Sequence, residues 1–189
     1  MEMTGEYRIP APRQRVWDAL NDVEVLRQCI PGCESVEQLS DVEIKTAVTA
    51  RVGPVKAKFT GTVTLSDRHP PNSYRIAGEG KGGTAGFAKG EAVVTLAEDG
   101  GDTVLTYTVS ATVGGKLAQI GSRLIDGAAR KMADEFFAAF AAIAGGEAAA
   151  AEEVAPEIPE KAPGLSPWVW IPGLIALVGL SLYFFGVAN

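Results

Sequence analysis

Strict alternation of apolar and polar residues predicts strands in the middle of the chain. Between Val55 and Leu65 every second residue except Gly61 is apolar, and lysines and threonines fill the positions between. The segment Thr103–Val113 repeats this pattern. A period of two residues is typical of a sheet with one buried and one solvated face. Short turn sequences separate these segments from further expected strands at 4–8, 35–39, 43–52, 73–80 and 87–97.

Helical spacing of apolar residues appears in two places. Two short helices are expected at 10–22 and 23–30, directly after the first strand. The longest helix is expected from Gly115 to Ala144, with a broad apolar stripe on one side. Phe137 lies on the polar side of that helix and is a candidate for contact with a partner protein. This order predicts an α+β domain at 1–144, in which a curved antiparallel sheet wraps around the long C-terminal helix and leaves a cavity between them.

The C-terminal part of the chain has a different composition. No charged residue occurs from Trp168 to Val187, and about 20 apolar residues are enough to cross the hydrocarbon of a bilayer. Trp168, Trp170 and Tyr183 stand near its ends, where aromatic residues favour lipid interfaces. We therefore predict a single transmembrane anchor at 168–187, with a buried core helix as the alternative. The acidic Pro/Ala-rich stretch 145–167 is expected to be a tether, with the domain on the cytoplasmic side.

The charge balance restricts the partners. The formal net charge of the chain is -6, and five of its acids lie between Gly145 and Pro167. Nucleic acids are bound mainly through lysine and arginine, so a nucleic-acid partner is not expected.

The stretch GEGKGGTAGFAKG at 78–90 raises the question of phosphate binding. A P-loop requires Gly-Lys followed by Ser or Thr at the start of a helix, whereas Gly82 follows Lys81 here. The spacing G-x-G-x-x-G is present, but it leads into a strand and not into a helix N-terminus. We therefore expect a hairpin with few side chains, which is either a bend in the curved sheet or a gate over the cavity mouth.

Groups suited to catalysis or metal binding are scarce. His69 is the single histidine and is expected to be solvated in a turn. Cys29 and Cys33 have no second pair of ligands nearby in sequence, so no metal site is predicted and both are interpreted as packing residues without a disulfide. Glu135 is expected near the cavity, in an ion pair with Lys131. No enzyme active site is predicted.

The order of elements, the stretch IPGCESVEQL at 30–39 and the hairpin ending GFAKGEA at 86–92 together resemble the CoxG proteins, a family of carbon monoxide dehydrogenase subunits. These belong to the START/Bet v 1-like helix-grip superfamily, and the resemblance spans about residues 1–144. It implies a helix-grip fold with a cavity for bulky apolar ligands. It also implies association with a molybdenum hydroxylase of the CO dehydrogenase type at the cytoplasmic membrane, and related members bind a respiratory quinone.

The residue patterns and the resemblance together lead to one hypothesis. The protein is an adaptor that recruits molybdenum CO dehydrogenase and receives menaquinone or ubiquinone from the membrane. No tightly bound cofactor is expected. A ligand-free tether and an enzyme of the same superfamily, such as a cyclase or hydrolase, are the alternatives. An open apolar tunnel would favour the quinone carrier. A core filled by its own side chains would favour the tether, and polar groups that converge inside the cavity would favour the enzyme. The residues expected to line the tunnel are Phe59, Val63, Tyr107, Val109, Leu124, Met132, Phe136 and Phe140. Those expected to gate it are Gly82, Gly83 and Phe87.

Overall fold

The computed structural model describes residues 1–146, so the predicted tether beyond Gly146 and the predicted anchor at 168–187 lie outside the described residues. The strands are β1 (Glu2–Ile9), β2 (Cys33–Gln38), β3 (Glu43–Val52), β4 (Val55–His69), β5 (Ser73–Lys81), β6 (Phe87–Asp99) and β7 (Asp102–Gly114). The helices are α1 (Arg13–Leu20), α2 (Val23–Cys29) and α3 (Ser122–Gly145), with short 3-10 turns η1 (Gly83–Ala85) and η2 (Ala118–Ile120). Within residues 1–146 no helix is long and apolar enough to cross a membrane.

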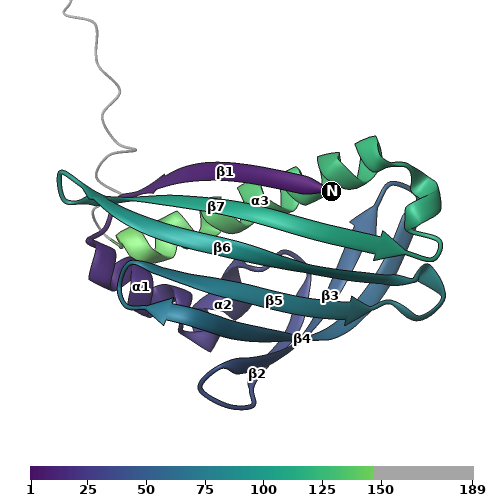
Figure 1. The fold of residues 1–189 in the computed structure, drawn as a ribbon, viewed down its shortest axis with the longest axis horizontal. Coiled ribbons are helices and arrows are strands. Elements are labelled where there is room, and N and C mark those ends of the chain that lie inside the picture. The colour runs from purple at the N-terminus through teal and green to yellow at the C-terminus, as the bar shows by residue number, and fades with distance from the viewer. Residues whose placement is uncertain (147–189) are drawn as a thin grey trace, which may run out of the picture. The chain divides into compact units, whose positions relative to one another are not determined.

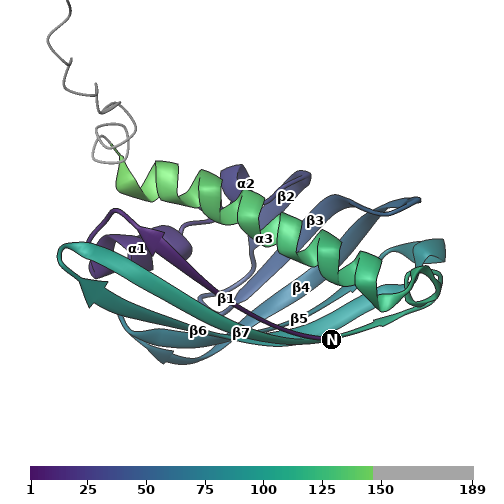
Figure 2. The same ribbon diagram turned by 90° about the horizontal axis from the view of Figure 1, so that it is seen from above.

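All seven strands form one antiparallel sheet in the order β1-β7-β6-β5-β4-β3-β2 (Figure 1). The six later strands follow one another as a meander, as their short turns predict. The first strand joins the last, so that Glu2 lies opposite Ser110 and Ile9 opposite Thr103. Figure 2 shows the sheet curving beneath α3, which crosses its concave face. The predicted α+β fold with a curved sheet around a C-terminal helix is confirmed.

The long helix begins later than the sequence pattern predicts. Gly115 and Gly121 have φ angles of +75° and +97°, a region that side chains with a Cβ rarely adopt and that interrupts a right-handed helix. Between them lies the turn η2, and α3 starts only at Ser122. Leu117, which the pattern places on the helix stripe, is instead buried in this connection, and its N–H donates to the carbonyl of Ala85 over 3.0 Å.

The apolar core lies at the end of α3 that is remote from this connection. Phe140, Leu105 and Val16 are fully buried there, so α3, β7 and α1 meet around one cluster. Trp17 packs edge-on against Tyr74 with ring centroids 5.4 Å apart. Burial of large side chains is the main stabilising term in such a domain. The C-terminal half of α3 is therefore held firmly against the sheet.

Aromatic stacking joins the middle of α3 to the edge strand β1. The rings of Tyr7 and Phe137 stack with centroids 4.1 Å apart. The hydroxyl of Tyr7 donates to Oδ1 of Asp134 over 2.6 Å. Desolvation and the nearby Asp134 carboxylate raise the pKa of Tyr7 above its ordinary value, so the phenol keeps its proton for this bond. Phe137 therefore lies half-buried against Tyr7 and Tyr107, which corrects the expectation that it faces a partner.

We expect Phe140→Ala to lower the free energy of unfolding of the domain by about 3–5 kcal/mol, because it leaves a cavity in a packed core. Phe87→Ala is the control, since that ring is 39% exposed and its loss should cost about 1 kcal/mol or less. Urea unfolding followed by circular dichroism measures both. Equal losses for the two variants would show that the core is not centred on Phe140.

Tyr7→Phe should lower the free energy of unfolding by about 1 kcal/mol, because it removes the hydrogen bond to Asp134 and keeps the stacked ring. Asp134→Ala should cause a similar loss, and the double variant should lose little more than either single variant. A double-mutant cycle in urea makes the measurement. Fully additive losses would mean that the two side chains do not interact in solution.

Candidate functional site

The space between the sheet and α3 is filled at one end and hollow at the other. At the α1 end the ring of Phe136 stacks on Phe140 with centroids 5.8 Å apart, and Phe137 stacks on Tyr107 at 5.7 Å. Toward the start of α3 the helix carries Leu124, Ala128 and other smaller or partly exposed residues. Two pockets occupy this second half, and we take them together as the candidate site.

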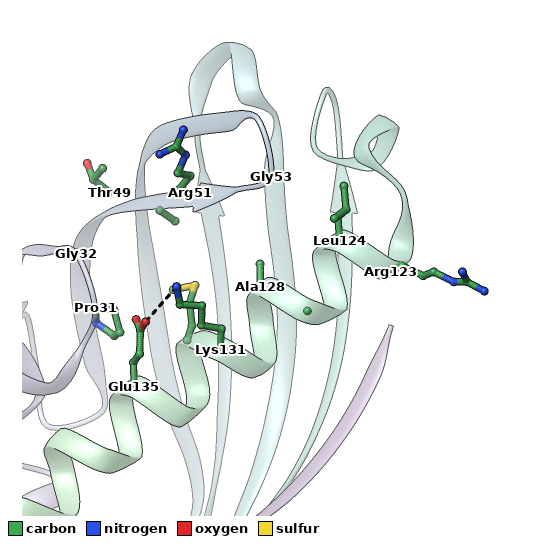
Figure 3. Close-up of a pocket in the computed structure, with 13 residues that line it drawn as sticks. Pro31, Gly32, Thr49, Arg51, Gly53, Arg123, Leu124, Ala128, Lys131 and Glu135 are labelled. Atoms are coloured by element: carbon green, nitrogen blue, oxygen red, sulfur yellow. Dashed lines mark ion pairs between the residues drawn. The ribbon is translucent and has the colours of Figure 1, made fainter. Parts of the chain in front are cut away.

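The first pocket has a volume of about 480 Å³ and lies between the first half of α3, strand β3 and the turn before β2 (Figure 3). The helix contributes apolar side chains such as Ala128 and Met132, and the strand contributes Thr49 and Arg51. An ion pair joins Lys131 Nζ to Glu135 Oε1 over 3.6 Å, as the sequence predicts. The remaining lining residues are Pro31, Gly32, Ala50, Gly53, Arg123, Leu124 and Gly127.

One wall of this pocket is formed by a backbone contact that the sequence pattern does not predict. The N–H of Thr49 donates to the carbonyl of Gly32 over 2.8 Å, which brings the turn after α2 against β3. Gly32 has a φ angle of +70°, and a β-carbon there would overlap the carbonyl of Thr49. The approach therefore requires glycine. Sequence reasoning missed Pro31, Thr49 and Arg51 as pocket residues because only this tertiary contact places them there.

The second pocket has a volume of about 280 Å³ and lies on the concave face of the sheet. Its walls are Phe59 and Val63, and its floor is made of residues with little or no side chain. The strand register aligns these small residues, with Gly61 opposite Gly80 and Gly78 opposite Gly90. Alanines continue the floor on β6 and β7. The further lining residues are Thr46, Val48, Thr62, Glu79, Ala88, Lys89 and Ala111.

This arrangement answers the question that the glycine-rich stretch raises. Glycines of β5 and β6 sit side by side within the sheet and hollow its concave face, rather than cradling a phosphate at a helix N-terminus. The two pockets share strand β3, because Val48 lines the second and the next residues, Thr49 and Ala50, line the first.

The residues predicted to line one tunnel are divided among three places. Phe59 and Val63 form the second pocket, and Leu124 and Met132 line the first. Leu124 is also 52% exposed. The other four belong to the filled end and pack in or against the core. These are Tyr107, Val109, Phe136 and Phe140.

The three predicted gate residues also separate. Gly82 lies against the ring of Phe59, so a β-carbon there would overlap the ring. Gly83 is exposed with a φ angle of +58°. Phe87 lies opposite Gly114, and its ring packs on that glycine. Because neighbouring residues of a strand point to opposite faces, Phe87 and Ala88 lie on different faces of β6. Ala88 lines the second pocket and Phe87 lines neither of the two pockets. The structure thus does not bring Phe87 to the cavity.

The described residues offer few groups for covalent or metal chemistry. Across residues 1–146 no three His, Cys, Asp or Glu side chains come together as a metal site. Cys29 and Cys33 are free, and burial raises the pKa of both thiols, which keeps them protonated and weakly nucleophilic. His69 ends β4, exposed, with Nδ1 2.9 Å from the carbonyl oxygen of Asp67. What the site offers is an apolar hollow with a charged margin.

Solved structures similar to the domain share this architecture. A conserved protein from Geobacillus kaustophilus is 32% identical with a TM-score of 0.72, over 76% of this chain and 95% of that one. A protein from Thermus thermophilus is 17% identical with a TM-score of 0.59, over 76% and 97%. The aromatase/cyclase Zhui from Streptomyces sp. R1128 is 15% identical with a TM-score of 0.54, over 76% and 93%. The last two show the fold alone, which is the Bet v 1-like helix-grip fold.

No curated protein matches the chain. The family model for CoxG, a subunit of carbon monoxide dehydrogenase, matches residues 5–145, which include every described strand except the first residues of β1, and all of α3. The chain therefore belongs to the CoxG family of accessory subunits, which links its role to carbon monoxide dehydrogenase.

Proposed function

We propose that this protein is a membrane-anchored adaptor for a molybdenum-containing CO dehydrogenase, and that it binds a respiratory quinone in the hollow half of its domain. Family membership supports the link to the dehydrogenase. The uncharged segment at 168–187 supports attachment to the cytoplasmic membrane, with the domain in the cytoplasm. In this role the adaptor holds the soluble enzyme near the bilayer and gives its electrons an acceptor drawn from the membrane.

The observation that carries the quinone proposal is the pair of pockets that share β3. The first, at about 480 Å³, is of the size that ligand sites in proteins have, and the second, at about 280 Å³, lies just below the usual range of roughly 300–1,000 Å³. A quinone consists of a flat ring and an apolar isoprenoid tail. The glycine floor of the second pocket allows a flat ring to lie against backbone, and Phe59 adds an aromatic face.

Polar groups at the margin of the first pocket suit the oxygens of a quinone ring. Quinone oxygens accept hydrogen bonds, and Arg51 and Lys131 are donors that line this pocket. The hydroxyl of Thr49 already donates to Oε1 of Glu34 over 2.6 Å. Arg51 forms no ion pair with any described residue, whereas Lys131 is paired with Glu135. We therefore expect Arg51 to meet the quinone at the entrance, before the ring reaches the glycine floor of the second pocket.

The test uses residues 1–146, whose buried core closes within that segment and whose Geobacillus relative is almost wholly covered by the domain. The segment is purified from a membrane-containing extract, and its solvent-extractable contents are identified by mass spectrometry. We expect menaquinone or ubiquinone at up to one molecule per domain. An empty domain that also takes up neither added quinone would leave the role of a ligand-free tether.

A variant that fills the floor makes the test specific for the second pocket. A β-carbon at Gly80 would have its nearest neighbour, Cβ of Phe59, at 3.9 Å, so the position has room for a side chain. We expect Gly80→Val to weaken quinone binding about tenfold or more, with stability unchanged or raised because valine favours strands. Ala77→Val is the matched control, since Ala77 is exposed and lines neither pocket of the site. Calorimetric titration with a short-chain quinone compares the two. Equal affinities would place the quinone elsewhere.

A further inference from the structure

Three connections pack together at the end of the domain where the hollow lies. A β-carbon at Gly53, in the turn between β3 and β4, would lie 3.5 Å from the side chains of Ile120 and Leu124. The bond from Leu117 N–H to the Ala85 carbonyl joins the connection before α3 to the loop between β5 and β6. Figures 1 and 2 show these segments together at the end opposite α1. We call residues 51–56, 81–89 and 115–124 the loop end.

The loop end is strongly basic in a chain that is acidic overall. Its three segments contain six lysines and arginines and no aspartate or glutamate, whereas the whole chain carries a net charge of -6. Acids gather instead at the opposite end, where Asp99 and Asp102 of the β6–β7 turn pair with Arg8. The six cations of the loop end are Arg51, Lys56, Lys81, Lys89, Lys116 and Arg123.

Most of these cations have no anionic partner among the described residues. Lys81 has Nζ 3.6 Å from Oε1 of Glu79, and Lys89 lies opposite the same glutamate in the β5–β6 ladder. Arg51 and Lys56 even lie directly opposite each other in the β3–β4 ladder. Like charges at facing positions destabilise a pair of strands. An anionic surface against this turn would attract both cations and offset that repulsion.

Large apolar side chains are exposed among these cations. Leu124 is 52% exposed and Phe87 is 39% exposed, and both belong to the loop end. Lysine and arginine around exposed apolar side chains are the combination that binds the surface of an anionic bilayer, because the cations attract lipid headgroups and the apolar groups enter the interface. A protein partner with an acidic face is the alternative, and vesicle binding in the absence of any other protein distinguishes the two.

We infer that the loop end is a second membrane contact, which docks on anionic lipid and directs the mouth of the hollow toward the bilayer. The first pocket opens beside it, since Arg51, Gly53 and Leu124 belong to both. The purpose of this contact rests on the proposed function, because a quinone would then enter the domain without crossing water. The contact itself requires only the surface.

The length of the chain allows docking and anchoring together. Helix α3 has 24 residues, so at about 1.5 Å per residue the loop end lies roughly 36 Å from Gly145. A chain of the length of 147–167 spans at most about 70 Å when fully extended. The predicted anchor at 168–187 can therefore enter the same bilayer on which the loop end rests.

Vesicle binding by residues 1–146, without added quinone, tests the inference. We expect the segment to sediment with vesicles that contain about 30% phosphatidylglycerol and not with pure phosphatidylcholine, and to be released by salt because salt screens charge. Lys56→Glu with Lys116→Glu should weaken binding about tenfold or more. The fold should tolerate this pair, because the first change replaces a like-charge pair by an opposite-charge pair.

The matched control is Arg15→Glu with Arg130→Glu, which changes the net charge equally and lies outside the loop end, at exposed arginines that form no ion pair with a described residue. We expect this variant to bind anionic vesicles with affinity reduced about threefold or less. Equal weakening by both pairs, or no binding of the unchanged segment to anionic vesicles, overturns the inference. Titration with a short-chain quinone in solution, on the same variants, reports the proposed function separately, because neither Lys56 nor Lys116 lines a pocket of the site.

Discussion

Packing around Phe140 is the constraint on which the rest of the domain depends. It fixes the C-terminal half of α3 against β7 and α1, in a cluster whose central side chains are fully buried. Because α3 is attached at this end, its other half only has to reach across the curved sheet. At its far end the turn between β3 and β4 lies next to Ile120 and Leu124, and the first pocket opens beside this contact. The packed core and the pockets thus lie at opposite ends of α3.

The hollow exists because side chains are absent from the sheet, and not because the strands are far apart. Gly61, Gly78, Gly80 and Gly90 are paired with one another in the ladders of β4, β5 and β6. Glycine within strands weakens a sheet, so this floor is a local loss of stability that the packed end offsets. The cationic loop end adds a second local loss through the facing Arg51 and Lys56. Both local losses of stability occur at the places where the proposed ligand and the inferred lipid surface would bind.

Much of the fold follows from the sequence, because alternation along a strand is a local property. The strands and their meander were predictable from residues such as Val63 and Leu105. The start of α3 was not, since the apolar spacing continues through Gly121 and only the backbone angle there interrupts the helix. The tunnel was predictable in part. Phe59 and Val63 lie where alternation places them, while the first pocket depends on the contact between Gly32 and Thr49, which no local pattern encodes.

The glycine floor also determines which positions of the second pocket can be altered by substitution. Gly90 has no room for a larger residue, because a β-carbon there would lie 2.6 Å from the carbonyl oxygen of Ser110, whereas a β-carbon at Gly80 would have Cβ of Phe59 as its nearest neighbour, at 3.9 Å. The backbone of β7 thus excludes a larger residue at Gly90, whereas a single substitution at Gly80 can change the depth of the floor. Each carbon added at Gly80 reduces the thickness of molecule that fits. A single substitution at Gly80 would therefore change the shape of the second pocket without any change in the core.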